Sequence, residues 1–218
     1  MEAVEIRRPV SVEEYLRMER ASPVKHEYVH GVVRALAGAS DRHNRLALRI
    51  AATLLPAAEA RGCRVYISDM RLVIRDQAGE VHYYPDVMVV CAEDPDPYAK
   101  TRPCLVVEVL SPSTRTIDLG EKRLAYMRLP SVEAYLVFDG DRPWAVGYYR
   151  TPEGFEERTW EGSGRRYTPQ PRLLVTPAGD PPSHRSSRVR ETRRSFARPG
   201  EAHRWTSVAV YIMPKAYS

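Results

Sequence analysis

The sequence predicts an α/β fold in which helices cover a β-sheet, and two apolar strands followed by a helix carry this prediction. The strands occupy residues 83–90 and 104–110, and both are rich in β-branched residues. Continuous apolar runs of this kind are typical of central strands that are buried on both faces. The helical stretch that follows covers residues 116–128. The other elements are placed around this strand–strand–helix unit.

The first sixty residues predict two helices separated by a hairpin. A capping box at the start of residues 11–20 begins a short helix. Residues 26–34 indicate two strands around a turn near His30-Gly31. A longer helix is capped at Ser40 or Asp41 and stopped by Gly62. Its buried stripe is expected to contain Leu46, Ala47, Ile50, Leu54 and Ala58.

The remaining elements are strands and one exposed loop. A strand is expected over residues 65–74, and a polar loop with three prolines over residues 92–103. After the helix, a strand over residues 132–139 leads into a hairpin formed by residues 144–150 and 155–160. The hairpin is expected to close the sheet.

Length and composition fit one domain with an appended tail. The chain has 218 residues, of which 43% are hydrophobic, and this is enough to bury one sizeable core. We expect one folded domain over residues 1–162. Residues 163–218 are biased toward Pro, Arg and Ser, and we expect this tail to be disordered or derived from a frameshift, apart from a strand at residues 206–213.

The positive charge belongs to the tail. Residues 163–218 hold 11 basic and three acidic residues, which leaves 22 basic and 25 acidic residues in the domain. The basic composition therefore does not indicate that the folded body binds nucleic acid, although one basic face could exist there. For the tail, a basic arm that binds DNA through counterion release is the alternative.

Cysteine usage and hydropathy predict a cytoplasmic protein. The three cysteines are widely spaced, so neither a disulfide framework nor a zinc site is expected. Cys91 and Cys104 are interpreted as small core residues. No apolar run approaches the ~18 residues of a membrane span, and residues 1–10 lack the apolar region of a signal peptide. We therefore expect no membrane association.

Each apolar strand carries one carboxylate where packing alone would select Val or Ile. These are Asp86 and Glu108. A lone buried carboxylate is costly, so it is neutralised, paired or bound to a cation. Neither strand contains Arg or Lys, and the pair therefore suggests a divalent metal. Hard oxygen ligands favour Mg²⁺ or Mn²⁺ over zinc. A solvent-facing strand end is the alternative for either acid.

Groups near the end of the second strand complete the candidate site. The backbone carbonyl of Val109 is a third candidate metal ligand. Lys122 lies on the following helix, and its side chain leans toward the start of that helix, within reach of the strand end. There it could orient water or offset phosphate charge, or it could pair with Asp118 four residues earlier. Candidate phosphate contacts are Ser111, Ser113 and Thr114.

Several segments together resemble one family. They are Tyr84-Pro85-Asp86, residues 105–114, residues 135–139 and the triplet Asp118, Lys122 and Tyr126. On these segments the chain resembles the Uma-two family of restriction endonucleases, a branch of the PD-(D/E)xK nuclease superfamily, over about residues 8–160. The resemblance implies a restriction-endonuclease-like mixed sheet flanked by helices. It also implies metal-dependent DNA cleavage, with Asp86 and Glu108 as ligands.

One departure from the superfamily pattern concerns the lysine. The usual Glu-x-Lys would place a lysine at position 110, where this chain has Leu110. The resemblance moves that role to Lys122. Glu27 and His43 also match recurring family positions. Glu27 could supply a third carboxylate or be an exposed hairpin residue, and His43 could contact phosphate or be an ordinary residue of a first helical turn.

The function predicted from these residues is that of a Mg²⁺- or Mn²⁺-dependent endodeoxyribonuclease. Asp86 and Glu108 would bind the metal, Lys122 would assist the attacking water, and Glu27 would support them. The alternative is a non-catalytic module of nuclease fold that binds DNA or a protein partner. A homodimer is expected by analogy, because nucleases of this fold often pair to cut two strands.

Overall fold

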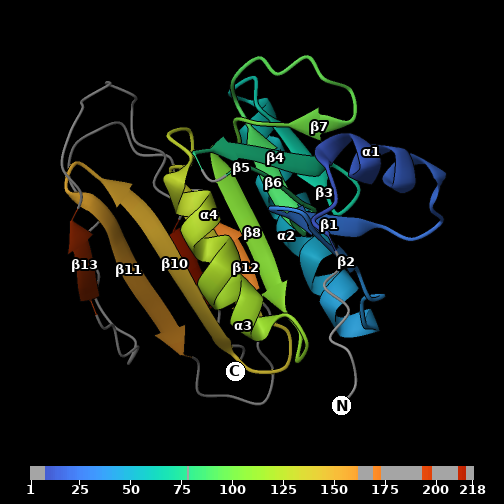
Figure 1. Cartoon of the computed structure of the whole chain (residues 1–218). Coiled ribbons are helices and arrows are strands. Elements are labelled where there is room, and N and C mark those ends of the chain that lie inside the picture. Colours follow the sequence, from blue (N-terminus) through green and yellow to red (C-terminus); the bar gives the residue numbers. More distant parts are fainter. Residues whose placement is uncertain (1–7, 78, 162–168, 173–192, 198–210, 215–218) are drawn as a thin grey trace, which may run out of the picture.

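The computed structural model describes residues 8–77, 79–161, 169–172, 193–197 and 211–214. Figure 1 shows the helices and strands of the chain. In order they are α1 (Val12–Ala21), β1 (His26–Val29), β2 (Val32–Ala35), α2 (Asp41–Glu59), β3 (Arg64–Ile67), β4 (Arg71–Asp76), β5 (Gly79–Tyr83), β6 (Val87–Val90), β7 (Ala99–Lys100), β8 (Leu105–Leu110), α3 (Arg115–Ile117), the π-helical turn η1 (Asp118–Lys122), α4 (Arg123–Arg128), β9 (Ala134–Asp139), β10 (Trp144–Thr151), β11 (Gly154–Glu161), β12 (Pro169–Arg172), β13 (Arg193–Ala197) and β14 (Tyr211–Pro214).

A large mixed sheet forms the centre of the domain. Its strand order is β13-β11-β10-β9-β8-β6-β3, so the two strands that carry the candidate carboxylates lie inside it. β6 pairs antiparallel with β8, and β8 pairs parallel with β9. Both neighbours of β8 are thus strands of the same sheet, and all six of its residues are buried. The expectation of central, doubly covered strands is confirmed for β6 and β8.

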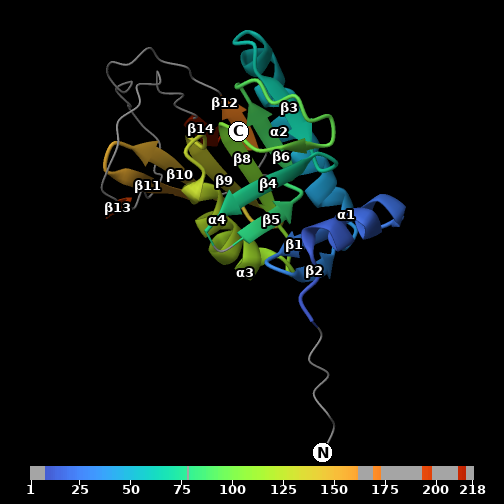
Figure 2. The same ribbon diagram turned by 45° about the horizontal axis from the view of Figure 1, so that its top comes forward.

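Two hydrophobic cores cover the two faces of this sheet. On one face, the predicted stripe of α2 packs against alternate residues of β6, β8 and β9, such as Val87, Val107 and Leu136. On the other face, the intervening residues of the same strands pack against α4 and a smaller sheet of order β2-β1-β5-β4-β7. Figures 1 and 2 show β4 and β5 of this smaller sheet crossing over the large sheet.

The start of each early element agrees with its sequence signal. Ser11 and Glu14 form the predicted capping box of α1. Ser40, one of the two predicted caps, is the N-cap of α2 and accepts a hydrogen bond from the backbone of His43. His30 and Gly31 both have positive φ, at 47° and 93°, and therefore form the turn between β1 and β2.

Two predicted strands are each divided in the structure. The expected strand over residues 65–74 is β3 and β4, which belong to different sheets. The expected strand over residues 83–90 is likewise broken, because β5 ends at Tyr83 and β6 begins at Val87. Pro85 lies in this break and cannot donate a backbone hydrogen bond to a sheet. Each break passes the chain from one sheet to the other.

The exposed loop over residues 92–103 contains a structured segment that was not predicted. The short strand β7 pairs parallel with β4, and both of its residues are buried. The hairpin prediction was correct: β10 and β11 pair antiparallel from Trp144↔Glu161 to Thr151↔Gly154. β13 then extends the large sheet beyond β11.

The helix predicted over residues 116–128 is three short segments. α3 and α4 flank the π-helical turn η1, which contains Gly120. Asp118, Lys122 and Tyr126 form the buried face, whereas Leu124 is 50% exposed. The π turn places the polar triplet toward the core.

The expectation for the cysteines was also wrong in part. Cys63 and Cys91 form a disulfide, and Cys104 is the free cysteine of the described chain. Cys91 is exposed rather than in the core. The Sγ atom of Cys104 lies 2.9 Å from that of Cys91. The sequence spacing of 28 residues gave no signal of this pairing.

Most of the tail lies outside the described residues. Within it, β12 pairs with β14, whose residues overlap the strand predicted at residues 206–213. The disordered or frameshifted origin of residues 163–218 stays a prediction. None of the helices in the described part of the chain has the length and apolar character needed to cross a membrane.

Candidate functional site

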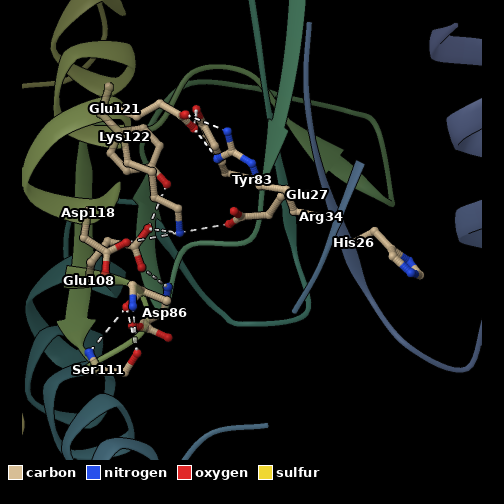
Figure 3. Close-up of polar contacts among 12 residues, drawn as sticks. His26, Glu27, Arg34, Tyr83, Asp86, Glu108, Ser111, Asp118, Glu121 and Lys122 are labelled. Carbon is tan, nitrogen blue, oxygen red and sulfur yellow. Dashed lines mark hydrogen bonds and ion pairs between the residues drawn. The ribbon is translucent and has the colours of Figure 1, made fainter. Parts of the chain in front are cut away.

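The carboxylates of Asp86 and Glu108 lie on the same face of the large sheet. The antiparallel register Val87↔Val107 continues to place Asp86 opposite Glu108. The neighbours Met88 and Val106 belong to the core between the two sheets, and side-chain alternation puts both acids on that side. The backbone N–H of Asp86 points at Glu108 Oε2, with a donor–acceptor distance of 3.4 Å. The predicted convergence of these two acids is present (Figure 3).

Lys122 is the cation at the centre of the site. Its Nζ lies 3.2 Å from Glu108 Oε1, 2.8 Å from Glu27 Oε1 and 3.4 Å from Asp118 Oδ1. Its side chain is only 5% exposed, so these contacts are shielded from water. Lys122 therefore both reaches the strand end and pairs with Asp118. The two roles considered from the sequence coexist.

Glu27 enters the site from the smaller sheet. It lies on β1 and is 4% exposed, which excludes the alternative of an exposed hairpin residue. Its partner across the hairpin register is Arg34 on β2. The smaller sheet thus delivers one carboxylate to a site whose other acids come from the large sheet and η1.

The buried acids outnumber the buried cation. Glu27, Glu108 and Asp118 surround Lys122, and Asp86 lies beside them. Burial raises the pKa of Glu108, and the neighbouring Asp118, Asp86 and Glu27 raise it further, while Lys122 opposes them. The pKa of Asp118 is also raised, mainly by burial. Burial and the neighbouring carboxylates therefore make Glu108 and Asp118 harder to ionise.

Lys122 remains protonated in this setting. Burial lowers the pKa of the Lys122 ammonium, but the carboxylates of Glu108, Glu27 and Asp118 outweigh burial and hold that pKa above its usual range. The ammonium also lies 5.5 Å from the centre of the Tyr83 ring, on its face. The side chain is consequently fixed as a cation between acids.

Tyr126 touches the site directly. Its hydroxyl donates a hydrogen bond of 2.8 Å to Glu108 Oε1, and its ring is fully buried. Tyr126 therefore both packs in the core and binds the candidate ligand Glu108. Its four-residue spacing from Lys122 was the available signal.

His43 contacts the other candidate ligand. It lies in the first turn of α2, and its Nε2 is 3.2 Å from Asp86 Oδ2. The bond to Asp86 raises the pKa of His43 despite partial burial, and the backbone of Val109 contributes in the same direction. His43 is therefore part of the site, and its contact is to a carboxylate.

Val109 contributes through its amide. The backbone N–H of Val109 donates a hydrogen bond of 2.7 Å to Asp86 Oδ2 and so fixes the Asp86 carboxylate beside Glu108. Its side chain points to the opposite face, into the core under α2. The predicted role of the Val109 carbonyl as a metal ligand stays a prediction.

The hydroxyls of residues 111–114 bond mainly to one another. Ser111 Oγ lies 3.0 Å from Ser113 Oγ and 2.9 Å from Thr114 Oγ1. The backbone N–H of Thr114 donates to Ser111 Oγ at 3.2 Å. This network shapes the turn between β8 and α3. Their predicted phosphate contacts stay a prediction, and the helix that follows is a short one.

A second ion pair joins the smaller sheet to η1. Arg34 and Glu121 form two parallel hydrogen bonds of 2.9 Å each, and Tyr83 donates to Glu121 at 3.0 Å. Arg34 is the register partner of Glu27, and Glu121 precedes Lys122. This clamp, visible in Figure 3, holds the elements that carry Glu27 and Lys122 together. Sequence reasoning missed it.

Comparison with known proteins shows the family to which the chain belongs. A family model named Uma2, with the description "Putative restriction endonuclease", matches residues 12–176. The chain belongs to the Uma2 family. The match extends past residue 162, the expected end of the domain. The family assignment made from the motifs is therefore confirmed.

Relatives of this Uma2 protein occur in Synechocystis sp. One, the uncharacterised protein sll1609, is 35% identical over 149 residues that cover 61% of this chain and 83% of the relative. Another, the uncharacterised protein slr1290, is 33% identical over 149 residues that cover 66% of this chain and 76% of the relative. Neither name states an activity.

A solved structure supports the nuclease fold of this Uma2 chain. It is a putative nuclease belonging to DUF820 from Anabaena variabilis, with a TM-score of 0.60 and 15% sequence identity. The alignment covers 78% of this chain and 90% of that protein. At this identity the likeness concerns the fold. The predicted restriction-endonuclease-like α/β fold is confirmed.

Proposed function

We propose that the protein is a divalent-metal-dependent endonuclease that hydrolyses phosphodiester bonds of DNA. The observation that carries the proposal is the convergence of Asp86 and Glu108 on one face, beside the buried Lys122. Membership of the Uma2 family supports a nuclease function in general terms. The metal, the DNA substrate and the roles of individual residues belong to the proposal.

The donor set fits a hard divalent cation. Among the described residues, no group of three or more His, Cys, Asp or Glu side chains is arranged to hold a metal ion. Mg²⁺, however, is usually bound by one or two carboxylates and completes its shell with water and substrate phosphate. Glu27 Oε1 and Asp118 Oδ1 are already paired with the Lys122 ammonium, at 2.8 and 3.4 Å, but this one cation serves three buried carboxylates, so the site can accept more positive charge. We assign Asp86, Glu108 and the carbonyl of Val109 as ligands.

A bound divalent ion would lower the pKa of the attacking water and screen the charge of the phosphate. The water oxygen forms a bond to phosphorus, and the bond from phosphorus to one ester oxygen breaks. The water gives up a proton to solvent, and the departing alkoxide takes one from solvent, which balances the hydrolysis. Lys122 holds positive charge next to the reacting phosphate, and Glu27 and Tyr126 keep Lys122 and Glu108 in position.

A second function is supported by a specific observation. Lys122 already contacts three carboxylates, and Leu110 occupies the usual lysine position of the superfamily. A site neutralised in this way fits a non-catalytic module of nuclease fold that binds DNA or a protein partner. Metal-dependent cleavage separates the two functions.

Cleavage of supercoiled plasmid tests the proposal. The purified full chain with Mg²⁺ or Mn²⁺ is expected to nick or linearise the plasmid, and chelation by EDTA is expected to stop it. Asp86→Asn and Glu108→Gln remove ligand charge with little change of shape, and each is expected to abolish cleavage. Asp76→Asn, at a carboxylate on β4 that bonds to Arg128, is the matched control and should cleave normally.

Two outcomes would contradict the proposal. Cleavage that survives both ligand substitutions would assign the activity to another site or to a contaminant. A wild-type chain that is folded and binds DNA but never cleaves it would favour the non-catalytic module. Gel filtration of the same samples tests the predicted homodimer.

A further inference from the structure

Three arginines gather at the end of the large sheet where β8 and β9 finish. Asp139, the last residue of β9, is in register with Leu110, the last residue of β8. Arg115 at the start of α3 and Arg142 after β9 both bind Asp139, and Arg42 at the start of α2 binds Asp141. We call Arg42, Arg115 and Arg142 the arginine edge. Figure 1 shows the end of β8, α3 and the start of α2 at the same end of the molecule.

The carboxylate of Asp139 holds two of these guanidinium groups in place. Its Oδ2 accepts hydrogen bonds from Arg115 NH1 at 2.8 Å and from Arg142 Nε at 3.1 Å. Its Oδ1 accepts from the backbone N–H groups of Asp141 and Arg142 at 2.9 and 3.1 Å. These bonds lower the pKa of Asp139 against the opposing effect of burial, so the carboxylate is ionised at neutral pH. The two arginines are thus fixed before any ligand arrives.

The outward charge of this edge is positive. The Asp139 side chain is 7% exposed, whereas those of Arg142 and Arg42 are 63% and 66% exposed. The exposed carboxylate of Asp141 offsets one of the three guanidinium charges and the buried Asp139 offsets a second, which leaves a net charge of +1 carried on exposed guanidinium groups. Nearby Asp41 is already paired with Arg45. Because the Asp139 carboxylate is buried and the arginine side chains are exposed, this edge presents a basic face. The domain as a whole carries more acidic than basic residues.

The remaining donors suit phosphate. A guanidinium has five N–H groups in a planar fork, and its contacts here occupy only some of them. Arg115 also lies over the Trp144 ring, 5.4 Å from its centre, which restrains its plane. Donors that are fixed and solvent-facing bind an anion with little loss of side-chain entropy.

The edge adjoins the proposed active site. Arg42 is followed by His43, which contacts Asp86, and Leu110 is followed by the turn that leads to Arg115. We propose that the arginine edge binds backbone phosphates of duplex DNA next to the phosphate that the site cleaves. This inference rests on the proposed function, because it takes DNA as the substrate of that site.

Salt-dependent DNA binding tests the inference without cleavage. Fluorescence anisotropy of a labelled duplex is measured in EDTA over a range of NaCl concentrations, with the full chain. The edge variant R42Q/R115Q/R142Q is compared with R61Q/R64Q/R102Q. The three control arginines are exposed and lie near the opposite end of β8. Their substitution removes the same amount of positive charge as the edge variant does. The basic tail is common to both variants.

The expected result follows from counterion release. Each lost phosphate contact reduces the slope of log K against log salt by about 0.9, so the edge variant should lose a slope of about 2–3 relative to wild type. The control variant should retain the wild-type slope within experimental error. Equal slopes for the edge and control variants would overturn the inference, as would a wild-type chain that does not bind DNA.

Loss of folding is distinguished by a second variant. Arg115 binds the buried Asp139, so its removal can destabilise the domain. The variant R42Q/R142K leaves Arg115 in place and keeps a positive charge at position 142, so Asp139 remains paired. It removes one charge, and the slope of log K against log salt should fall by about 1. Thermal unfolding confirms that each variant is folded. If the slopes change as expected but no variant or wild type cleaves plasmid with Mg²⁺, the proposed function fails and the phosphate-binding edge stands.

Discussion

At the scale of residues, the site depends on how buried acids share one buried cation. Glu27, Glu108 and Asp118 each contact Lys122, and each is almost fully shielded from water. Removing one partner of such a network leaves uncompensated buried charge, which costs more than the net value of the pair. The network therefore restricts which substitutions the fold can accept.

Lys122→Met is expected to lower the free energy of unfolding by about 3–5 kcal/mol, because it leaves the three acids without their cation. The double variant Lys122→Met/Glu108→Gln should lose less than the sum of the single losses, since one of the unpaired charges is gone. Urea unfolding of wild type, the two single variants and the double variant gives the coupling free energy between Lys122 and Glu108. Strict additivity would show that Lys122 and Glu108 do not interact energetically.

Tyr126→Phe tests whether a buried hydroxyl holds the Glu108 ligand. The variant loses the hydrogen bond of 2.8 Å to Glu108 Oε1 and should lose about 1.5–3 kcal/mol of stability together with metal affinity. Tyr135→Phe is the matched control, because its buried hydroxyl donates to the backbone carbonyl of Asp118 at 2.9 Å. The control should lose stability but retain affinity for Mn²⁺. Equal metal affinity in both variants would refute a positioning role for Tyr126.

The sequence predicted which residues gather at the candidate site better than it predicted the contacts that hold them there. Asp86, Glu108 and Lys122 were identifiable because apolar strands and a four-residue helical spacing made their polarity anomalous. Arg34 and Glu121 gave no such signal, because charged residues on a hairpin and on a helix are ordinary at the surface. Their pairing depends on how the smaller sheet packs against η1. Such a contact is set by tertiary structure and could not be predicted from either segment alone.

At the scale of elements, the breaks in predicted strands and helices serve the site. Pro85 separates β5 from β6, so the chain passes from the smaller sheet to the large one just before Asp86. The π turn η1 interrupts the predicted helix and places Asp118 and Lys122 inward while Glu121 meets Arg34. The periodicity of the sequence indicated a helix correctly, but a π turn has no distinct pattern of apolar residues.

The Arg34–Glu121 clamp predicts a pH dependence of stability. Burial raises the pKa of Glu121, but hydrogen bonds from Arg34 and Tyr83 and the charges of Arg34 and Lys122 outweigh it and lower that pKa. A lowered folded pKa contributes stability that is present above the unfolded pKa of about 4.3 and is lost as pH falls through the folded pKa. The stability advantage of wild type over Glu121→Gln should therefore be largest near pH 7 and shrink below about pH 4.3.

Urea unfolding of wild type and Glu121→Gln at several pH values measures this advantage. Glu157→Gln, on β11, provides a control for the general effect of removing one carboxylate. An advantage that stays constant from pH 7 to pH 3 would show that the clamp does not bind the ionised form of Glu121 preferentially.

At the scale of the whole molecule, the site lies where two sheets meet. The large sheet supplies Glu108, the segment just before β6 supplies Asp86, the smaller sheet supplies Glu27, and η1 supplies Lys122. No single segment of the sequence contains this arrangement. The fold class and the order of elements followed from periodicity and from the family motifs, whereas the division into two sheets and the Cys63–Cys91 disulfide did not.

Metal titration by isothermal calorimetry tests the central claim most directly. Asp86 and Glu108 are proposed to share a divalent ion, so wild type should bind Mn²⁺ with measurable heat at one site per chain. Asp86→Asn and Glu108→Gln should each lose that binding while Asp76→Asn retains it, provided that all chains are folded by circular dichroism. A wild-type chain without metal binding, or ligand variants that bind as wild type does, would contradict the account.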